Sequence, residues 1–313
     1  MYHFIVNPAS RSGKGKKLWT QTLEPALKRR DISYKVHFSA KPGDLTRIAM
    51  ELSQNADSPN THIVVVGGDG TVNETLQGIF SDTNTNAGSN VTISYIPTGS
   101  SNDLARDLGF SKKPLEILDH MLEGSQPENM DAGVLSSSNG SRMFAVSCGI
   151  GFDAAVCQEA NLSKVKKFFN KIGLGKLTYL GIALKQLFAA KAVSCDIYLD
   201  DNEPIHLKKF LFIAVMNHRY EGGGFKFCPD AKSGDGLLDL CVVGNLPKLL
   251  ILFALPTAFF GKHYIFPRID SYKAARVRIK TSAPLWVHTD GEVIEQNTDI
   301  TIACAPGQIR LRY

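Results

Sequence analysis

The segment up to about Asp131 alternates short β-branched runs with stretches of helical pattern, and this alternation limits the available folds more than any other feature. The runs are YHFIVN, SYKVHFSA, HIVVV and VTISYIP. Helical patterns lie from about Lys16 to Arg30, after Gly43 and after Thr71. Strands that alternate with helices form a parallel sheet covered on both faces. We therefore expect an α/β domain in this part of the chain.

The pattern changes beyond about Asp131. Strand-like runs are separated there by turn residues, and one helical region around residues 159 to 192 interrupts them. The runs are MFAVSCGIG, SCDIYLDD, KKFLFIAVMN, LLDLCVVG, ARVRIKTS, LWVHTDGEV and TDITIACAP. Such a series is typical of an antiparallel β-sandwich. Because 313 residues exceed the common size of one domain, the sequence predicts two packed domains.

Charge and cysteine content narrow the classes of partner and compartment. The 35 basic and 30 acidic side chains give a formal charge of +5 without the clustering typical of nucleic-acid binders, so no nucleic-acid partner is expected. A mildly basic protein suits phosphate ligands or an anionic membrane surface. The six cysteines show no C-x-x-C pair and no metal-type spacing, which indicates reduced thiols in a cytoplasmic protein.

Neither a secretion signal nor a transmembrane helix is expected. MYHFIVNPAS enters a strand directly, without the charged start and apolar core of a signal peptide. The most apolar stretch, LLILFALPTAFF from Leu249, follows Lys248 and is interrupted by Pro256. It also falls short of the roughly 20 residues that span a bilayer.

The loop after HIVVV has the composition of a phosphate-binding turn. Its glycines are Gly67, Gly68 and Gly70. Glycine adopts backbone angles closed to other residues and lets a ligand approach the main chain. Thr71 and Glu74 fit a capping box, so we expect a helix that starts at Thr71 with its N–H groups facing an anion. A tight turn in which Asp69 bonds its own backbone explains the loop equally well.

Two further loops share this design. VNPASRSGKGKK from Val6 leads from a strand into a loop with Gly13, Lys14 and Gly15, although the P-loop pattern is absent and an exposed basic loop is the common alternative. IPTGSSNDLARDLGF from Ile96 places polar residues before a third helix, namely Gly99, Ser100, Ser101, Asn102, Asp103 and Arg106. Ligands of open parallel sheets bind beyond the carboxyl ends of the strands, where such loops converge. Three loops together favour a phosphate ligand over simple turns.

The ordered motifs resemble one family. NPASRSGKGK, GGDGTVNE and PTGSSNDLAR, followed by MDAG, PDAKSGDGLLD and DGE, resemble the diacylglycerol kinase catalytic-domain family, which includes bacterial lipid kinases and sphingosine and ceramide kinases. The set spans nearly the whole chain. G-G-D-G alone is less specific, because phosphofructokinases and NAD kinases carry a similar element. The resemblance implies ATP-dependent phosphorylation of a lipid hydroxyl.

The same resemblance implies a fold. Its first domain is a Rossmann-like α/β nucleotide-binding domain, similar to those of phosphofructokinases and NAD kinases. Its second is a C-terminal antiparallel β-sandwich that receives the lipid. The resemblance implies that the reaction takes place in the cleft between the two domains. The last strand often returns to the first domain in such folds. We therefore expect residues 1–133 with about 297–313 in the nucleotide-binding domain and residues 134–296 in the sandwich.

By this resemblance the glycine loops hold the phosphates of ATP, and Asp69 lies near a Mg²⁺ that bridges them. Phosphoryl transfer depends on positioning and charge neutralisation, which backbone amides and a metal supply. Ser39 is included, although similar proteins often have threonine there and a hydroxyl at a strand end is often only a cap. The ATP-binding set is Asn7, Ser10, Gly13, Lys14, Gly15, Ser39, Gly67, Gly68, Asp69, Gly70, Thr71, Asn73, Glu74, Gly99, Ser100, Asn102 and Asp103.

The acceptor hydroxyl is a poor nucleophile until a base takes its proton. Glu292, after the turn of Asp290 and Gly291 in HTDGEV, matches the proposed base of the family, and Asp131 in MDAG matches the acidic residue that orients or assists it. Without the resemblance, Glu292 would be an ordinary exposed turn glutamate. The expected catalytic residues are Glu292, Asp131 and Asp69.

A second metal site is also implied. Lys232, Asp235 and Leu237 in PDAKSGDGLLD match positions where bacterial members hold a structural Mg²⁺ through one carboxylate, carbonyls and waters. Gly234 stands where many relatives have a second aspartate, which lowers the available charge. A simple turn into the strand LLDLCVV is the alternative.

Three remaining features are assigned less specifically. His288 and His218 are interpreted as structural or exposed, and NHRYEGGGFKF from Asn217 resembles a glycine-rich turn that shapes the acceptor pocket, or is a loop between strands. KVKKFFNKIGLGKLTYLGIALKQLF from Lys164 interleaves lysines with apolar residues and could lie on an anionic bilayer. Packing of its apolar stripe on the sandwich is the commoner arrangement.

These observations predict an ATP- and Mg²⁺-dependent lipid kinase that is cytoplasmic, meets the inner face of the cell membrane peripherally and phosphorylates a diacylglycerol-like lipid. A kinase of a soluble acceptor, such as NAD or a sugar phosphate, and a non-catalytic lipid- or nucleotide-binding regulator are the alternatives. The sandwich and the DGE motif argue against the first, and the acidic residues Asp69, Asp131 and Glu292 against the second. The sequence leaves open the acceptor lipid, the regulators and the oligomeric state, a homodimer included.

Overall fold

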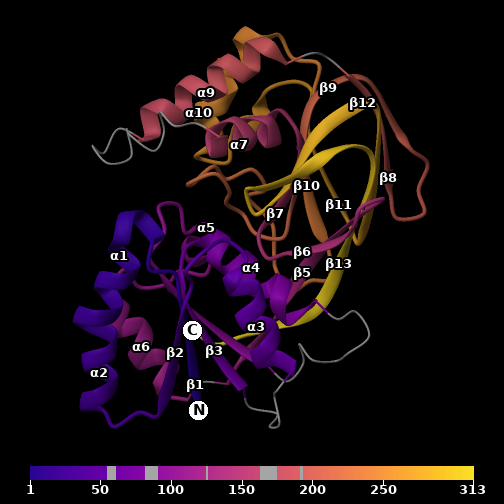
Figure 1. Ribbon diagram of the computed structural model, residues 1–313. Helices are drawn as coiled ribbons and strands as arrows, with labels where there is room; N and C mark the ends of the chain where they lie inside the picture. The colour runs from indigo at the N-terminus through magenta and orange to yellow at the C-terminus, as the bar shows by residue number, and fades with distance from the viewer. Residues whose placement is uncertain (55–60, 82–90, 125, 163–174, 191–192) are drawn as a thin grey trace. The chain divides into compact units, whose positions relative to one another are not determined.

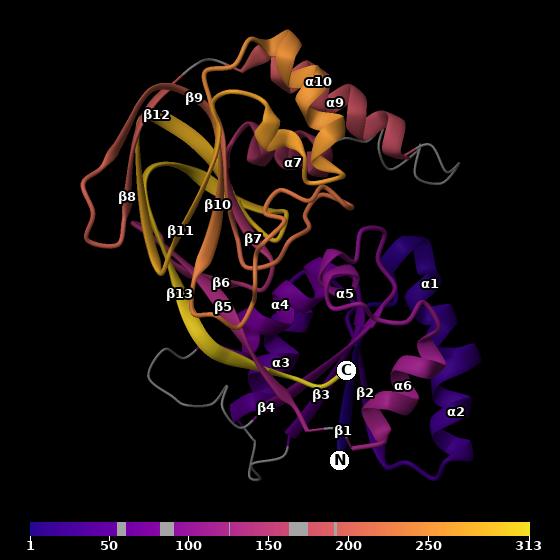
Figure 2. The same cartoon turned by 180° about the vertical axis from the view of Figure 1, so that it is seen from behind.

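The computed structural model describes residues 1–54, 61–81, 91–124, 126–162, 175–190 and 193–313, and the side chains of 175–180 are outside that description. It divides into two compact units, Met1–Ala132 with Ala305–Tyr313 and Gly133–Cys304, which we name unit 1 and unit 2. The division falls inside two strands, β5 (Glu128–Ser137) and β13 (Glu292–Leu311). Figures 1 and 2 show the elements of both units.

Unit 1 contains a parallel sheet of β1 (Tyr2–Val6), β2 (Tyr34–Phe38), β3 (Thr61–Gly67) and β4 (Val91–Pro97). The strands pair in the order β2-β1-β3-β4, and the end of β13 joins β4 in parallel. β3 and β4 are buried along almost their whole length, as central strands covered on both faces should be. The α/β fold expected from the alternating pattern is confirmed.

Helices cover both faces of this sheet. One face packs against α1 (Ser10–Leu18), the π-helix η1 (Trp19–Leu23), α2 (Glu24–Arg29) and α6 (Pro114–Leu122), through a core that includes Phe4, Val6, Trp19, Leu27, Val64, Ile96 and Leu118. α3 (Asp44–Gln54) and α4 (Asp69–Ile79) lie on the other face (Figures 1 and 2). A short α5 (Asp103–Asp107) follows β4.

Unit 2 is an antiparallel β structure. Its strands are β6 (Gly140–Phe144), β7 (Ser147–Gly151), β8 (Val193–Leu199), β9 (Ile205–Met216), β10 (Leu238–Gly244), β11 (Ile269–Ala274) and β12 (Arg276–Thr289), together with parts of β5 and β13. They follow the order β11-β10-β9-β7-β12-β13, while β8 pairs with β12 and β9, and β6 pairs with β5. The sandwich-type second domain expected from the sequence is confirmed.

Two apolar clusters form the core of unit 2. Alternate residues of β10 point to opposite faces, because successive side chains of a strand do so. Leu238, Leu240 and Val242 join the cluster between strands, whereas Cys241 and Val243 join a cluster covered by helices. These helices are α7 (Phe152–Leu162), α9 (Gly175–Ala189), α10 (Lys248–Ala258) and the 3₁₀ turn His263–Ile265. Among the described residues, no helix is both long and apolar enough to cross a bilayer.

Candidate active site

Three loops at the carboxyl ends of β1, β3 and β4 in unit 1 are joined by hydrogen bonds. Asn7 Nδ2 donates to Thr71 Oγ1 at 3.2 Å. The hydroxyls of Ser10 and Thr98 share a hydrogen bond of 2.7 Å, and Thr98 N donates to Gly67 O at 2.6 Å. The structure therefore brings together the three segments that the sequence assigned to the phosphates of ATP.

Close contacts and unusual backbone angles explain several small residues of these loops. A Cβ on Gly99 would lie 2.7 Å from Gly68 Cα, so the β3 and β4 loops meet backbone to backbone. In the β1 loop, Arg11, Ser12 and Gly13 have φ angles of 44°, 58° and 94°. Two of these residues are not glycine, and strained backbone of this kind clusters at ligand-binding sites.

Asp69 links the β3 and β4 loops through its carboxylate. Oδ2 accepts a hydrogen bond from Asp103 N at 3.0 Å, and Oδ1 accepts one from Leu104 N at 3.4 Å. These are the first residues of α5, so Asp69 caps that helix. A carboxylate offers about four lone-pair positions, and Mg²⁺ prefers carboxylate oxygens. Asp69 therefore holds the two loops together, and its contact with a metal-bound nucleotide stays a prediction.

The start of α4 differs from the expectation. The helix begins at Asp69 with Gly68 as its N-cap, and Thr71 Oγ1 accepts a hydrogen bond from Gly68 N at 3.3 Å. The prediction that the helix starts at Thr71, with Glu74 closing the capping box, is wrong. Because glycine has no side chain with which to cap, Thr71 supplies the cap from the first turn of the helix.

Sequence reasoning missed two residues of this site, Thr98 and Tyr95. Tyr95 OH donates to Asn102 Oδ1 at 3.1 Å, and Asn102 Nδ2 donates to Gly99 O at 3.1 Å. Burial, followed by the charges of Asp69 and Asp103, raises the pKa of Tyr95 well above its usual value, so the phenol stays a neutral donor. Tyr95 lies inside the strand-like run VTISYIP, where nothing marks it as different from a core residue.

The remaining residues expected to bind ATP range from buried to exposed. Lys14 and Ser100 are exposed, whereas Asn73 is fully buried in α4. Ser39 follows β2, and its N–H donates to Val6 O at 3.1 Å, which places it beside the β1 loop. Contact of these residues with a nucleotide stays a prediction.

Glu292 of unit 2 follows a two-residue turn between β12 and β13. The turn residues Asp290 and Gly291 have φ angles of 50° and 81°, as in the tight hairpin turns that connect antiparallel strands. The Asp290 carboxylate accepts three hydrogen bonds of 2.8 to 3.0 Å, from the N–H groups of Ala145, Val146 and Ser147. The expected turn is thus present and firmly held, and the Glu292 side chain is exposed.

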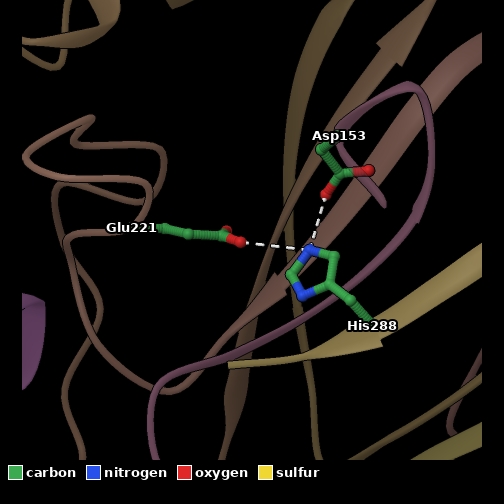
Figure 3. Close-up of side chains that lie close together, drawn as sticks. All are labelled: Asp153, Glu221 and His288. Carbon is green, nitrogen blue, oxygen red and sulfur yellow. Dashed lines mark hydrogen bonds and ion pairs between the residues drawn. The ribbon is translucent and has the colours of Figure 1, made fainter. Parts of the chain in front are cut away.

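Asp153, Glu221 and the buried His288 form a cluster (Figure 3), and His288 is bonded to this turn. His288 Nδ1 accepts a hydrogen bond from Gly291 N at 3.1 Å, and His288 Nε2 lies 3.2 Å from Asp153 Oδ2 and 3.1 Å from Glu221 Oε1. Burial lowers the pKa of His288, but Glu221 and Asp153 raise it, and the result lies well above the usual value. His288 is therefore a structural residue, as expected, but one with two charged partners that sequence reasoning missed.

The ligand atoms of this cluster lie within 4.8 Å of one another, close enough to share a metal ion. The hydrogen bonds of the ring argue against that role. Gly291 N–H occupies the lone pair of Nδ1, so the ring carries its hydrogen on Nε2. Histidine binds a metal through an unprotonated nitrogen. His288 Nε2 is thus a donor to two carboxylates.

The glycine-rich turn that contains Glu221 has an irregular backbone. Gly222, Gly223 and Gly224 have φ angles of 62°, 87° and 121°, and Glu221 N donates to Phe225 O at 2.9 Å. The turn therefore delivers the Glu221 carboxylate to His288. Its role in an acceptor pocket stays a prediction.

Asp131 lies on the part of β5 that belongs to unit 1. Its side chain is buried, and Oδ1 accepts a hydrogen bond from Gly307 N of β13 at 2.8 Å. This bond fixes the carboxylate against the returning strand of the same unit. Glu292 belongs to unit 2, so the pairing of the two acids in one site stays a prediction.

At the expected structural Mg²⁺ site of Lys232, Asp235 and Leu237, a lysine competes for the carboxylate. Lys273 Nζ lies 3.0 Å from Asp235 Oδ2 and 3.3 Å from Asp239 Oδ2. Asp235 Oδ1 accepts a hydrogen bond from Leu237 N at 3.1 Å. The ammonium group already neutralises the carboxylate that would hold the metal, so a metal ion would have to displace Lys273 from it. Metal binding by these residues stays a prediction.

Comparisons with known proteins match both halves of the chain. Residues 1–135 match the diacylglycerol kinase catalytic domain, and residues 146–313 match the YegS C-terminal NAD kinase beta sandwich-like domain. The chain is 28% identical over 232 residues to a diacylglycerol kinase of Mycobacterium tuberculosis (strain CDC 1551 / Oshkosh), covering 74% of this chain and 70% of the relative. It is 25% identical over 318 residues to the Bacillus subtilis (strain 168) protein assigned as lipid kinase YtlR, with 99% of each chain covered.

A solved structure shares the fold. The crystal structure of a diacylglycerol kinase from Bacillus anthracis str. Sterne has a TM-score of 0.71 at 21% identity, over 100% of this chain and 96% of that chain. At this identity the likeness supports the fold alone, while the family assignment comes from the matched domains. The chain therefore belongs to the diacylglycerol kinase catalytic-domain family and carries the YegS-type C-terminal β-sandwich-like domain.

Proposed function

We propose that this protein is an ATP-dependent lipid kinase that transfers the γ-phosphate of ATP to the hydroxyl of a diacylglycerol-like lipid. The proposal is carried by one observation, the joining of three glycine-containing loops at the strand ends of unit 1. Loops at this edge of a parallel sheet are where phosphate ligands bind. Membership of the diacylglycerol kinase family supports the choice of a lipid as acceptor.

In this proposal the phosphates of ATP lie against the β1, β3 and β4 loops. The close approach of Gly68 and Gly99 leaves main chain rather than side chains at the β3 and β4 loops. Asp69 fixes the start of α5 and offers a carboxylate near the nucleotide. A Mg²⁺ bound with ATP would neutralise charge on the transferring phosphoryl group.

On the acceptor side, Glu292 takes the proton of the lipid hydroxyl as its oxygen bonds to the γ-phosphorus and ADP leaves. A base must keep a defined position to act in this way. The three hydrogen bonds to Asp290 and the bond from Gly291 N to His288 hold the turn from which Glu292 projects. Asp131 is proposed as the acidic residue that orients or assists Glu292.

The test is direct phosphorylation. The purified full-length chain is incubated with Mg²⁺ and γ-labelled ATP, and diacylglycerol, monoacylglycerol, phosphatidylglycerol, undecaprenol, ceramide and sphingosine are supplied separately in mixed micelles. NAD and glucose 6-phosphate are supplied without micelles. We expect label in diacylglycerol.

Two outcomes contradict the proposal. Label in a soluble acceptor alone would show a kinase of the NAD or sugar-phosphate type. Binding of ATP without label in any acceptor would favour a regulator. A label that persists in Glu292→Gln would remove that residue from the mechanism, because glutamine keeps the shape of the side chain but cannot accept the proton.

A further inference from the structure

Helix α10 of unit 2 is apolar on both sides, and within the described part of the chain only one side is covered. The covered side consists of Ile251, Ala254 and Ala258. The exposed apolar side chains, which we name the α10 surface, are Leu249, Leu250 and Phe253 of the helix with Phe260 and Ile265 of the turns that follow. A helix that is apolar all round is ordinarily enclosed by protein or by lipid.

The exposure of this surface is large. Phe253, Phe260 and Ile265 are 63%, 75% and 74% exposed. Leu249 and Phe253 are four residues apart, and this spacing places them side by side on one face of a helix. Single exposed apolar residues are common on proteins, but a group of large ones in one place marks an interaction site.

The packing beneath α10 fixes the surface in this position. Phe259 stacks on Phe225 with ring centroids 4.1 Å apart. The cavity under the helix measures about 20 Å³, which leaves room for about one water molecule and none for another large side chain. Lys248 Nζ donates to Phe188 O at 2.6 Å and to Ala190 O at 3.0 Å, so the start of α10 is tied to the end of α9. Figures 1 and 2 show these helices side by side.

The elements that carry and border the surface hold more basic than acidic residues. Between Asp239 and Asp270 the sequence contains no acidic residue, but it contains Lys248, Lys262 and Arg268. α9 likewise has no acidic residue and carries two lysines, of which Lys185 pairs with Glu159 of α7. Apolar side chains bordered by cations suit the interface of a membrane with anionic lipids, where acyl chains cover the former and headgroups attract the latter.

We propose that the α10 surface docks the protein on an anionic lipid bilayer. The inference rests on the proposed function, because a diacylglycerol-like acceptor has to be reached in a membrane. A second copy of this chain is the less favourable occupant. A two-fold interface places the same surface on both sides, so Lys248, Lys262 and Arg268 of one copy would face the same cations of the other.

This surface differs from the one that the sequence indicated. The lysine-rich segment from Lys164 lies largely outside the described residues, so its contact with a membrane stays a prediction. The apolar stretch from Leu249 is too short to span a bilayer. An apolar stretch that is too short to span can still lie along the interface.

The experiment measures binding of the full-length chain to large unilamellar vesicles by co-sedimentation. Vesicles of phosphatidylcholine alone are compared with vesicles that contain equal parts of phosphatidylcholine and phosphatidylglycerol. We expect binding to the anionic vesicles and a loss of affinity of about tenfold or more in the double variant Phe253→Ser/Phe260→Ser, since two large apolar groups no longer enter the interface. The matched control is Phe38→Ser, which removes an apolar side chain of unit 1 that is 44% exposed and should bind as the wild type does.

Assays of lipid phosphorylation distinguish a failure of the docking proposal from a failure of the proposed function. The double variant should keep wild-type phosphorylation of a short-chain diacylglycerol dissolved below its micelle concentration and lose phosphorylation of diacylglycerol in vesicles. If no lipid is phosphorylated, the proposed function fails while the sedimentation result still decides the docking surface. Equal sedimentation of the double variant and the wild type would overturn the docking proposal. So would a wild-type dimer that the double variant converts to a monomer.

Discussion

Two regions built for different tasks are held together by different kinds of group. The three loops of unit 1 are joined mainly by hydroxyls, amides and glycine backbone, as in the pairs Asn7–Thr71, Ser10–Thr98 and Gly68–Gly99. The Asp69 carboxylate, which accepts from Asp103 N, is the charged group among these links. The Glu292 turn of unit 2 is held by ionisable groups, those of Asp290 and the Asp153, Glu221 and His288 cluster. The first region should therefore be sensitive to added atoms, and the second to the removal of a single charged group.

The largest expected effect is a loss of catalytic rate when Glu292, the exposed residue that follows the turn of unit 2, is replaced. Glu292→Gln should lower kcat by about 10² to 10⁴, the range in which a general base contributes. The melting temperature should stay the same, because the side chain is exposed. The control is Glu295→Gln on the same strand, whose carboxylate bonds Asn139 and Asn297 and should leave kcat unchanged. Equal activity of the two variants would refute the assignment of Glu292.

Replacement of His288, which is buried and bonded to the same turn, should lower the stability of the protein. His288→Gln removes the imidazole that lies between two buried carboxylates, and loss of one partner of a buried charged group typically costs about 3 kcal/mol. Among the described residues, Asp153 Oδ1 and Glu221 Oε2 already have no hydrogen-bond partner, so other donors are not at hand. The free energy of unfolding in urea measures the cost.

A surface histidine provides the control for this variant. His206 forms an exposed pair with Asp196, and surface pairs contribute about 0 to 1 kcal/mol. His206→Gln should therefore change stability little. If both histidine variants unfolded with the same free energy, the charged cluster would not hold the turn as described.

The loop region of unit 1 should be disrupted by the addition of one atom. Gly99→Ala places a Cβ 2.7 Å from Gly68 Cα, so the β3 and β4 loops have to separate, at a cost of about 1–3 kcal/mol. The affinity for ATP should also fall when the loops separate, since both loops are proposed to contact phosphates. Gly234→Ala is the control, because a Cβ there has no neighbour within 4 Å. Calorimetric titration with ATP would contradict the model of joined loops if Gly99→Ala bound as tightly as Gly234→Ala.

The two units also contain histidines that respond to pH in opposite directions. Burial, and then the charge of Arg312, lowers the pKa of His62 in unit 1 to about 3. The unfolded chain therefore takes up this proton first, and the contribution of neutral His62 to stability is lost as the pH falls below about 6.5. The raised pKa of His288 has the opposite sign, since its contribution is complete below the unfolded-state pKa and is lost as the pH rises through the folded-state value.

His62→Asn tests the first of these signs. At pH 7 the variant loses the hydrogen bond of His62 to Ser94 and should be destabilised by about 1 kcal/mol. At pH 5 the wild type has lost part of its advantage, so the difference between the two proteins in urea unfolding should be smaller. A difference that grew toward acid would show that His62 is charged in the folded state.

The contrast between the units also separates what the sequence reveals from what it hides. The loops of unit 1 are continuous motifs at strand ends, and the topology of a parallel sheet brings such ends together. Asp153 and Glu221 meet His288 only through the pairing of distant antiparallel strands, in which His288 lies opposite Gly149 of β7. Register of this kind depends on the whole sheet and not on a local pattern. Likewise, the composition of α10 does not reveal that one of its faces is left uncovered.

The smallest expected effect is a change in melting temperature with Mg²⁺, and it depends on the pairing of the antiparallel strands β10 and β11. Lys273 of β11 lies opposite Asp239 of β10 and reaches Asp235, where the motif had predicted Mg²⁺. Because the ammonium supplies the cation, 5 mM Mg²⁺ should change the melting temperature of the ATP-free protein by less than about 1 °C, as expected when a ligand does not bind the folded state. The double variant Gly234→Asp/Lys273→Met restores a second carboxylate and removes the competing charge, so Mg²⁺ should then raise the melting temperature. A Mg²⁺-dependent rise in the wild type would instead show that the metal displaces the lysine, and would confirm the site that the motif predicted.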